Sequence, residues 1–387
     1  MMTRAGPTRI LIVDDSVVMR SLLRTVVCAD AGLEVVGTAA DGASALTAIE
    51  SGKPDLVLLD VEMPVMDGLA TLRELRTRGH NMPVIMCSSL TQRGARVTIE
   101  ALACGASDYV AKPAGQSGRE AAIQTLGQEL IPKIRALTGA GQPLRPRQPM
   151  TTVSVPGLSR LPLPAVAFRP QTVSSMPEVL VIGVSTGGPA ALDRILPMLP
   201  ASFPLPVVIV QHMPEVFTRL LAERLNGRCP LQVREAVEGD AVRPGVIQIA
   251  RGNWHLELLA GVRATVSSAV PPHPTLHLSQ GPQENHCRPA VDVLFRSAVE
   301  VYGSGVLAVV LTGMGSDGLI GCHLIREGGG SVLAQDQPTS TVWGMPGAVA
   351  NAGLAHKVLP LDAIGPEICR IAARTLTDAR GLHRTAV

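Results

Sequence analysis

The stretch Val179-Leu-Val-Ile-Gly-Val-Ser-Thr-Gly-Gly-Pro189 decides how the second half of the chain folds. Its apolar beginning predicts a buried strand, and the amphipathic stretch at about 189–199 predicts a helix. Ser185 therefore lies on the turn between them, where unpaired N–H groups and the helix dipole favour negative charge. Gly183, Ser185 and Gly187 also have the spacing of a nucleophile elbow. Alone, such a turn is more often a plain helix start or a phosphate cradle than the site of a nucleophile.

Two more polar residues follow predicted strand ends in the same half of the chain. His212 comes just after the apolar run 207–210, and Asp317 lies in the glycine-rich turn after the apolar run 306–311. Because the carboxyl ends of parallel strands meet at one edge of a sheet, we expect Ser185, His212 and Asp317 to lie close together. An imidazole that takes the serine proton, oriented by a carboxylate, would make Ser185 a nucleophile. The order Ser, His, Asp differs from that of α/β-hydrolases, so we do not assign that fold.

The remaining segments of this half complete a layered domain. Short alternating stretches broken by turn residues predict antiparallel hairpins at 231–235, 245–250, 255–259 and 263–267. A helix is predicted at 291–302. Over residues 178–387 we therefore expect a three-layer α/β/α, doubly wound, mostly parallel sheet with an antiparallel hairpin portion.

The first part of the chain alternates strands and helices five times. Apolar strands are predicted at 10–13, 34–38, 56–59, 84–87 and 109–111, with helical spacing starting near residues 16, 42, 68, 93 and 119. Five such units over residues 8–137 predict a flavodoxin-like (βα)5 domain with a parallel sheet and helices on both faces. The working residues of such folds lie at the carboxyl ends of the strands.

The polar residues at those strand ends have side chains that suit a single kind of binding site. Asp14, Asp15 and Asp60 would converge at one edge, and three carboxylates repel one another unless a divalent cation neutralises them. Oxygen-only ligands favour Mg²⁺. Ser88 and Lys112 at neighbouring strand ends suit the oxygens of a phosphoryl group. The sequence therefore predicts a magnesium and phosphoryl site.

The motifs Ile-Val-Asp-Asp-Ser, Leu-Leu-Asp-Val-Glu-Met-Pro-Val-Met-Asp-Gly and Tyr-Val-Ala-Lys-Pro resemble the receiver domain of two-component response regulators, from Arg9 to about residue 137. The resemblance implies that Asp60 accepts phosphate from a histidine kinase, in this case a chemotaxis kinase. It implies that Asp15 binds Mg²⁺ directly, that Asp14 assists, and that the backbone carbonyl of Glu62 is a further ligand.

The same resemblance assigns the sensing of the phosphate. Ser88 and Lys112 would contact the phosphoryl group, and Tyr109 would be a coupled rotamer switch. Ser88 stands where many receivers have threonine, which preserves the hydroxyl. For Tyr109, a half-buried ring with a solvated hydroxyl is an equally good interpretation.

The second half resembles the catalytic domain of the chemotaxis protein-glutamate methylesterase family. The similar motifs are Gly-Val-Ser-Thr-Gly-Gly-Pro, Gln-His-Met-Pro-Glu-Val-Phe-Thr, Arg-Pro-Ala-Val-Asp-Val-Leu-Phe and Leu-Thr-Gly-Met-Gly-Ser-Asp-Gly. The resemblance implies hydrolysis of glutamate γ-methyl esters and deamidation of certain glutamines on methyl-accepting chemoreceptors. It implies Ser185 as nucleophile, His212 as base and Asp317 as third member. The ester step would need no cofactor, and Mg²⁺ would belong to the receiver.

Two departures from the family pattern lie near these motifs. The family often has His-Arg-Pro where this chain has Cys287-Arg288-Pro289, with His286 displaced by one position, and Ala-Pro-Gly where this chain has Ala250-Arg251-Gly252. Both could alter the rim of the cleft. Cys287 could itself be a nucleophile only with a lowered pKa.

Other polar residues of this half have weaker claims to a role. His255 and His286 are rival bases, with His255 expected to be a half-exposed structural histidine and Asp292 a helix cap. The backbone N–H groups of Thr186 and Met314 are our candidates for the oxyanion hole. The alternative function for the whole chain is a response regulator with a non-catalytic scaffold output.

Bulk composition narrows the class of protein. Residues 138–177 hold eight prolines, four arginines and no Asp or Glu, which predicts an extended linker between the domains. The net charge of +2, without a basic stripe or helix-turn-helix pattern, gives no case for nucleic acid. Seven scattered cysteines without a CxxC pair indicate free thiols. With no signal-peptide pattern and no run long enough to span a membrane, we expect a cytoplasmic protein without membrane insertion.

Overall fold

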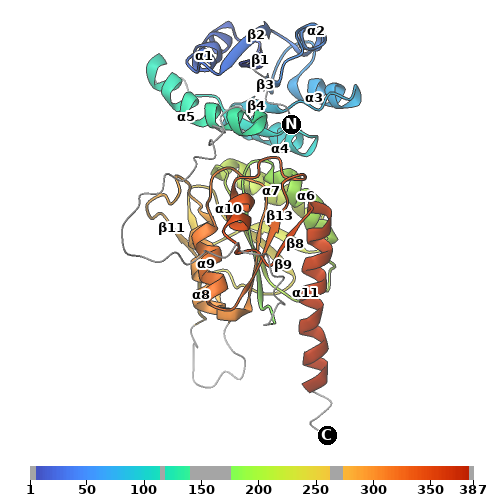
Figure 1. Cartoon of the computed structure of the whole chain (residues 1–387), viewed down its shortest axis with the longest axis vertical. Helices are drawn as coiled ribbons and strands as arrows, with labels where there is room; N and C mark the ends of the chain where they lie inside the picture. The colour runs from blue at the N-terminus through green and yellow to red at the C-terminus, as the bar shows by residue number, and fades with distance from the viewer. Residues whose placement is uncertain (1–5, 114–117, 140–175, 262–272, 383–387) are drawn as a thin grey trace, which may run out of the picture.

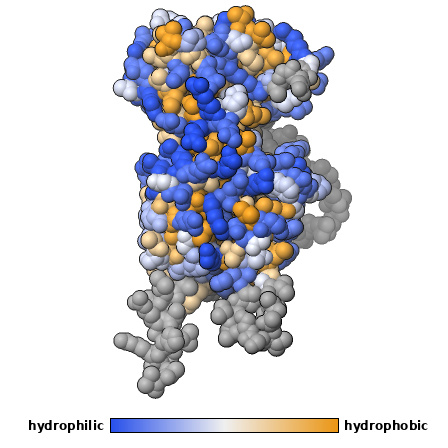
Figure 2. All heavy atoms as spheres, turned by 180° about the vertical axis from the view of Figure 1, so that it is seen from behind, coloured by the Kyte–Doolittle hydropathy of each residue, from blue (hydrophilic) through white to orange (hydrophobic). Residues whose placement is uncertain are grey.

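The computed structural model describes residues 6–113, 118–139, 176–261 and 273–382. It has two lobes stacked along the long axis, with α4 and α5 of the first above α6 and α7 of the second (Figure 1). Seen from behind, hydrophilic residues cover most of the surface of both lobes (Figure 2). Within the described residues, no helix is both long enough and apolar enough to cross a membrane.

The first lobe is a five-stranded parallel sheet with the strand order β2-β1-β3-β4-β5. Helices α1 and α5 cover one face, and α2, α3 and α4 cover the other. This confirms the predicted (βα)5 domain. Its strands are β1 (Thr8–Val13), β2 (Leu33–Ala39), β3 (Leu56–Asp60), β4 (Val84–Ser88) and β5 (Asp108–Ala111), and its helices are α1 (Val17–Cys28), α2 (Gly42–Gly52), α3 (Gly68–Thr77), α4 (Gln92–Ala103) and α5 (Arg119–Thr138).

Local sequence explains where these helices begin. In each of α1 to α4 the side chain before the first turn accepts a hydrogen bond from a backbone N–H inside that turn, as a helix N-cap does. The capping residues are Ser16, Asp41, Asp67 and Thr91. Each follows a strand closely, so the polar strand ends and the helix starts lie at the same edge of the sheet.

The second lobe is a seven-stranded sheet in the order β14-β13-β12-β6-β7-β9-β8, and all of its pairings are parallel. The first strand of the lobe, β6, lies between β7 and β12, so the order of strands reverses beside it. Ligands of open α/β sheets bind at this kind of reversal. The strands are β6 (Val179–Val184), β7 (Val207–Gln211), β8 (Gln232–Glu235), β9 (Val246–Ile249), β12 (Val306–Val310), β13 (Ser331–Gln335) and β14 (Lys357–Leu359).

Helices cover both faces of this sheet, which confirms the three-layer prediction. One face packs against α6, α7 and α11, and the other against α8, α9, α10 and a two-stranded antiparallel sheet of β10 and β11. The bounds are α6 (Gly188–Ile195), η1 (Leu196–Met198), α7 (Glu215–Asn226), β10 (His255–Leu259), β11 (Thr275–Ser279), α8 (Val291–Tyr302), η2 (Gly303–Gly305), α9 (Leu319–Glu327), α10 (Met345–Asn351) and α11 (Leu361–Leu382).

The predicted hairpins were partly wrong. The segments predicted at 231–235 and 245–250 form β8 and β9, which are parallel to each other and extend the main sheet. Of the predicted hairpin segments that the structure describes, β10 alone forms an antiparallel pair, and its partner is β11. The segment predicted at 263–267 lies outside the described residues. Alternation marks a half-buried strand but carries no information on the direction of its neighbour.

The two lobes touch through α4, which packs against α6 and α7. The ring of Tyr109 at the start of β5 stacks on Phe217 of α7, with centroids 4.5 Å apart and planes at 23°. The hydroxyl of Thr186 donates to Oδ2 of Asp108 at 2.7 Å. An exposed ion pair joins Arg96 to Glu223 at 3.7 Å. The first lobe therefore lies over the turn that carries Ser185.

Candidate active site

The turn after β6 holds Ser185 in a fixed backbone. The N–H of Ser185 donates to the carbonyl of Thr312 at 3.0 Å, and its own carbonyl accepts from Gly188 N at 2.7 Å and from Gln211 Nε2 at 3.0 Å. Gly187 has φ of 77°, and a Cβ there would lie 2.3 Å from Oγ1 of Thr341. Only glycine fits such a position. The turn is therefore built to present the half-buried Ser185 at the sheet edge.

His212 lies beside Ser185 because their strands are neighbours. β6 and β7 are paired so that Val184 stands opposite Gln211, and the next residues along are Ser185 and His212. Adjacent parallel strands are about 4.8 Å apart. The N–H of His212 donates to the carbonyl of Val184 at 3.1 Å, which continues the ladder by one residue.

The carboxylate of Asp317 holds one nitrogen of the imidazole. Nε2 of His212 lies 2.7 Å from Oδ2 of Asp317, which is 2% exposed. Oδ2 also accepts from the N–H of Val291 at 2.7 Å, and Oδ1 accepts from the N–H groups of Asp292 and Gly318 at 3.0 and 2.9 Å. A carboxylate surrounded by donors stays ionised. Nε2 of His212 therefore carries a hydrogen and donates a hydrogen bond to Asp317.

Electrostatics favour an ion pair between these two groups. Burial alone would lower the pKa of His212, but its hydrogen bonds to Asp317 and Cys287 outweigh burial and raise the pKa to about 9. Burial alone would raise the pKa of Asp317, but hydrogen bonds from His212, Val291 and Asp292 keep the pKa of that carboxyl below its ordinary value. The pair is thus stabilised in its charged form, which is the form that arises when His212 takes a proton.

Sequence reasoning missed Asn285 as a member of this site. Its side-chain Nδ2 donates to Oδ1 of Asp317 at 2.9 Å and to Oδ2 of Asp292 at 3.0 Å, so it links two carboxylates. Burial raises the pKa of Asp292. The expectation that Asp292 caps its own helix was wrong, since its Oδ1 accepts from Gly321 N in α9. No motif spacing could have revealed this, because Asn285 lies on a turn of irregular backbone.

Two backbone N–H groups near Ser185 are free to bind an anion. Within the described residues, the N–H groups of Thr186 and Met314 donate to no other group. The Gly313 peptide lies close enough to Ser185 that a Cβ on Gly313 would come within 2.8 Å of Cβ of Ser185. The oxyanion hole at these two N–H groups stays a prediction.

Of the two rival histidines, His255 has a different environment from the one expected. His255 is buried rather than half-exposed, because Nε2 lies 2.8 Å from the carbonyl of Pro282 and Nδ1 accepts from Ala290 N at 3.2 Å. Both of its nitrogens are used in holding the loop 282–290. His286 is exposed, and the adjacent Cys287 is the residue that reaches His212.

The altered rim residue Arg251 lies beside the strand end of His212. Its Nε donates to Oε1 of Glu215 at 3.0 Å, and its guanidinium lies over the ring of Trp254 at 5.6 Å from the centroid. A cation over an aromatic face is held by the ring quadrupole. Arg251 is therefore held by Glu215 and Trp254, and within the described residues it makes no hydrogen bond or ion pair with His212 or Asp317.

In the first lobe, the residues predicted for the magnesium and phosphoryl site lie close together. One ligand oxygen from each of Asp14, Asp15 and Asp60 lies within 4.8 Å of the others. Nζ of Lys112 bridges Oδ2 of Asp14 and Oδ1 of Asp60 at 2.8 and 2.7 Å. Burial raises the pKa of Asp60 against the opposing effect of Lys112. Ser88 is buried at the end of β4 beside them. Three oxygen ligands without nitrogen or sulfur fit a hard divalent cation such as Mg²⁺.

Tyr109 is more enclosed than a half-buried ring with a solvated hydroxyl, which corrects that interpretation. Its side chain is 5% exposed because it packs under Phe217, and Nζ of Lys133 donates to its carbonyl at 2.6 Å. The carboxylate of the preceding Asp108 accepts from Thr186 and lies 3.5 Å from Nζ of Lys133. These contacts join the start of β5 to the Ser185 turn.

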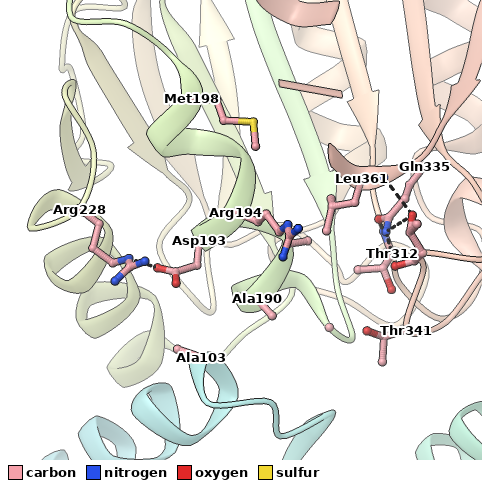
Figure 3. Close-up of a pocket in the computed structure, with 13 residues that line it drawn as sticks. Ala103, Ala190, Asp193, Arg194, Met198, Arg228, Thr312, Gln335, Thr341 and Leu361 are labelled. Carbon is pink, nitrogen blue, oxygen red and sulfur yellow. Dashed lines mark hydrogen bonds and ion pairs between the residues drawn. The ribbon is translucent and has the colours of Figure 1, made fainter. Parts of the chain in front are cut away.

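A cavity of about 520 Å³ lies between the lobes on the far side of this turn. Ala103 of α4 lies across from Ala190 of α6, and Gly187 and Thr312 form the wall shared with the Ser185 turn (Figure 3). Its charged groups are already paired, with Arg228 bonded to Asp193 at 2.8 Å and Arg194 to Asp362 at 2.7 Å. The cavity contains none of the three predicted catalytic side chains.

The fold and the two strand-end sites define a domain of the phosphoryl-receiver type followed by a second parallel α/β domain, which carries Ser185, His212 and Asp317 after the ends of its three central strands. Residues 10–124 match the family model of the response regulator receiver domain, and residues 180–368 match that of CheB methylesterase.

Relatives of known name cover almost the whole chain. The protein-glutamate methylesterase/protein-glutamine glutaminase of Nocardioides sp. is 49% identical over 373 residues, which are 95% of this chain and 96% of that protein. The protein of the same name from Trichodesmium erythraeum is 47% identical over 362 residues, which are 94% of this chain and 98% of that protein. The chain belongs to the family of CheB methylesterases that carry a receiver domain.

Proposed function

We propose that this protein hydrolyses glutamate γ-methyl esters on methyl-accepting chemoreceptors and deamidates specific receptor glutamines. His212 takes the proton of Ser185, whose oxygen attacks the ester carbonyl. The protonated imidazole then gives the proton to the leaving methoxide, so methanol departs and an acyl-enzyme remains. Water, deprotonated by the same imidazole, releases the carboxylate and restores Ser185.

The arrangement of His212 and Asp317 at 2.7 Å is the observation that supports this chemistry best. With Nε2 held by Asp317, Nδ1 is the nitrogen that receives the serine proton. A charged imidazolium formed in a buried site needs a fixed carboxylate, and Asp317 is fixed by five donors. In the tetrahedral intermediate, the oxyanion would accept from the free N–H groups of Thr186 and Met314.

The receiver would control this reaction by accepting phosphate on Asp60 from a chemotaxis histidine kinase. Asp14, Asp15 and the carbonyl of Glu62 would hold Mg²⁺ with Asp60, and the cation would neutralise charge on the phosphoryl oxygens when bound. Lys112, which now spans Asp14 and Asp60, would turn to the phosphoryl group together with Ser88. We keep the division into a receiver at 8–137, a linker at 138–177 and a catalytic domain at 178–387.

Phosphorylation would act on the ester site through β5. This four-residue strand has Lys112 just past one end and Asp108 and Tyr109 at the other. Asp108 and Tyr109 make the contacts to Thr186 and Phe217 that hold the receiver over the Ser185 turn. A shift of Lys112 toward the phosphoryl group would pull on this strand and loosen those contacts, which would open the cleft to a receptor helix.

Methanol release from a methylated chemoreceptor tests the ester chemistry. Ser185→Ala should abolish release, because the variant lacks the nucleophile. Ser316→Ala is the matched control, since Ser316 is exposed beside Asp317 and has no place in the reaction. It should keep wild-type activity.

Two outcomes would contradict the proposal. Release that persists in Ser185→Ala would assign the chemistry to another residue. No release from wild type with several methylated receptors would favour the alternative of a non-catalytic scaffold output.

A further inference from the structure

The second nitrogen of His212 already has a partner. Nδ1 lies 3.6 Å from Sγ of Cys287, within the reach of a hydrogen bond that involves sulfur. Because Nε2 is engaged by Asp317, Nδ1 is the nitrogen available for proton transfer. Within the described residues, the thiol of Cys287 is the group that contacts this nitrogen by a hydrogen bond, and the hydroxyl of Ser185 makes none.

The backbone around Cys287 is held rigidly. The N–H of Cys287 donates to the carbonyl of Glu284 at 2.9 Å, and the N–H of Glu284 donates back at 3.2 Å. Between them Asn285 and His286 have φ of 52° and 62°, as in a tight turn with two left-handed residues. Oε1 of Glu284 also accepts from Arg296 of α8 at 2.7 Å. The turn is therefore fixed to the body of the domain.

The ends of the same loop are tied down by separate contacts. His255 bonds the carbonyl of Pro282 and the N–H of Ala290. Nη1 of Arg288 donates to the carbonyl of Gly281 at 2.9 Å, and Nη2 to Oδ1 of Asn253 at 2.7 Å. Asn285 binds Asp317 itself. The loop thus places the thiol against the imidazole by the same network that orients Asp317.

The other cysteines are unlike this one. Burial raises the pKa of the thiols of Cys87, Cys322 and Cys369, and raises that of Cys229 to about 11. Cys28 is exposed on α1, and Cys104 follows α4. Among all seven, which are all within the described residues, Cys287 is the one that lies against an imidazole. A thiol beside a basic imidazole loses its proton more easily and reacts faster with electrophiles.

We propose that Cys287 is a positioning residue of the ester site: its thiol shares a proton with Nδ1 of His212, holds the ring until the hydroxyl of Ser185 replaces it, and makes the enzyme sensitive to thiol modification. The inference rests on the proposed function in that His212 is the base. In the resting pair, Sγ–H donates to Nδ1 or the thiolate accepts from Nδ1–H. Either state keeps the other proton on Nε2 and the ring facing Asp317.

Alkylation provides the test, because it removes the shared proton and adds bulk at Nδ1. With iodoacetamide, the sulfur lone pair forms a C–S bond, the C–I bond breaks, iodide leaves and the thiol proton passes to His212 or solvent. The carbamidomethyl group on Sγ would then crowd Nδ1, the nitrogen that has to receive the proton of Ser185. Methanol release should stop once Cys287 is modified.

The experiment follows methanol release and the extent of modification at each cysteine by mass spectrometry in the full chain. We expect wild type to lose activity in proportion to modification of Cys287. Cys287→Ser should stay active within about threefold and resist the reagent, since a hydroxyl can bond the same nitrogen. Cys28→Ala, which removes an exposed thiol remote from the site, should lose activity as fast as wild type.

The rate of modification itself reports on the proton sharing without any need for esterase activity. At pH 7 Cys287 should react at least tenfold faster than Cys28, with a pH profile that shows a second inflection from His212. His212→Gln should abolish both the excess rate and that inflection.

A second readout separates positioning from mere structure. The acidic limb of the kcat/KM profile should move to lower pH in Cys287→Ala, because the contact with Cys287 raises the pKa of His212. Cys287→Ser should recover kcat relative to Cys287→Ala.

Three results would overturn the inference. The first is modification of Cys287 without loss of activity, and the second is equal inactivation of Cys287→Ser and wild type. The third is a rate of alkylation at Cys287 no higher than at Cys28. If wild type released no methanol while Cys287 still showed the His212-dependent rate, the proposed function would fail and the thiol–imidazole pair would stand.

Discussion

The two lobes of this molecule use the same structural platform for different chemistry. Each has a parallel sheet whose first strand lies inside the sheet, and each places its polar groups just past the carboxyl ends of the central strands. One edge carries Asp14, Asp60 and Lys112, and the other carries Ser185 and His212. The sheet brings the polar side chains together at one edge, and the chemistry of those side chains decides the reaction.

The two edges also differ in how they treat charge. In the receiver, Lys112 bridges Asp14 and Asp60 at 2.8 and 2.7 Å, so the positive charge that balances these carboxylates lies on a side chain with rotatable bonds. In the hydrolase, three backbone N–H groups and the side chain of Asn285 surround Asp317, so most of its donors are fixed by the fold. A movable charge suits a switch, whereas a fixed charge suits catalysis. The predictions below test this difference.

Asp317→Asn should have the largest effect. The amide would favour the wrong imidazole tautomer and could not stabilise the imidazolium, so kcat should fall by roughly 10⁴-fold, as expected for a triad carboxylate. Methanol release under saturating receptor measures it. Asp362→Asn is the matched control, since its carboxylate pairs with Arg194 at the surface, and it should lose almost nothing. If kcat of Asp317→Asn fell by less than tenfold, the fixed carboxylate would not be essential for catalysis, and the contrast between the two sites would fail.

The pH dependence should be the next largest effect. His212 must be neutral to accept a proton, and contacts with Asp317 and Cys287 raise its pKa to about 9, with Asp292 lying behind Asp317. The neutral fraction therefore rises with pH, and kcat/KM should increase by about 50-fold from pH 7 to pH 9 before it levels off. Initial rates corrected for spontaneous ester hydrolysis would show it. A flat profile over this range would mean that His212 is not the titrating base.

Removing the aromatic contact between the lobes should have a smaller effect. Tyr109→Leu loses the stacking on Phe217, which is worth about 0.5–1.5 kcal/mol beyond area burial. Without phosphodonor, methanol release should rise by roughly 2–12-fold, because the receiver is held less firmly over Ser185. Arg78→Ala, at the end of α3 on the receiver's surface, where Arg78 pairs with Glu50 and Glu74, is the control and should leave basal release unchanged. Basal activity equal to wild type in Tyr109→Leu would show that the stack does not hold the cleft closed.

The ion pair between the lobes should contribute least. Arg96 and Glu223 are exposed and 3.7 Å apart, and exposed pairs stabilise by about 0–1 kcal/mol. Arg96→Ala should change basal release by less than about fivefold, and any change should disappear at high salt. An increase larger than that of Tyr109→Leu would reverse the ranking of the interface contacts.

The sequence predicted the strand ends well and the loops poorly. Continuous apolar runs bounded by glycine and polar residues mark buried parallel strands, so the positions of Ser185, His212 and Asp317 at one sheet edge followed from the pattern. Motif resemblance added the family. The direction of β8 and β9 did not follow, because strands of four residues are too short for their pattern to distinguish parallel from antiparallel pairing, and β9 is buried throughout.

Contacts that depend on irregular backbone could not be predicted from the sequence. Cys287 reaches His212 because Asn285 and His286 adopt left-handed conformations that no spacing rule predicts. The bond from Thr186 to Asp108 joins residues of two domains, and no periodicity within either domain carries that information. Each of these contacts depends on tertiary geometry rather than on local preference.

The most direct test of the whole account is methanol release by wild type and Asp60→Asn, each with and without acetyl phosphate and Mg²⁺. The account predicts that the phosphodonor raises release by wild type several-fold and leaves Asp60→Asn at the unstimulated level, since the asparagine cannot be phosphorylated. Equal stimulation of both proteins, or none of either, would contradict a hydrolase controlled through its receiver.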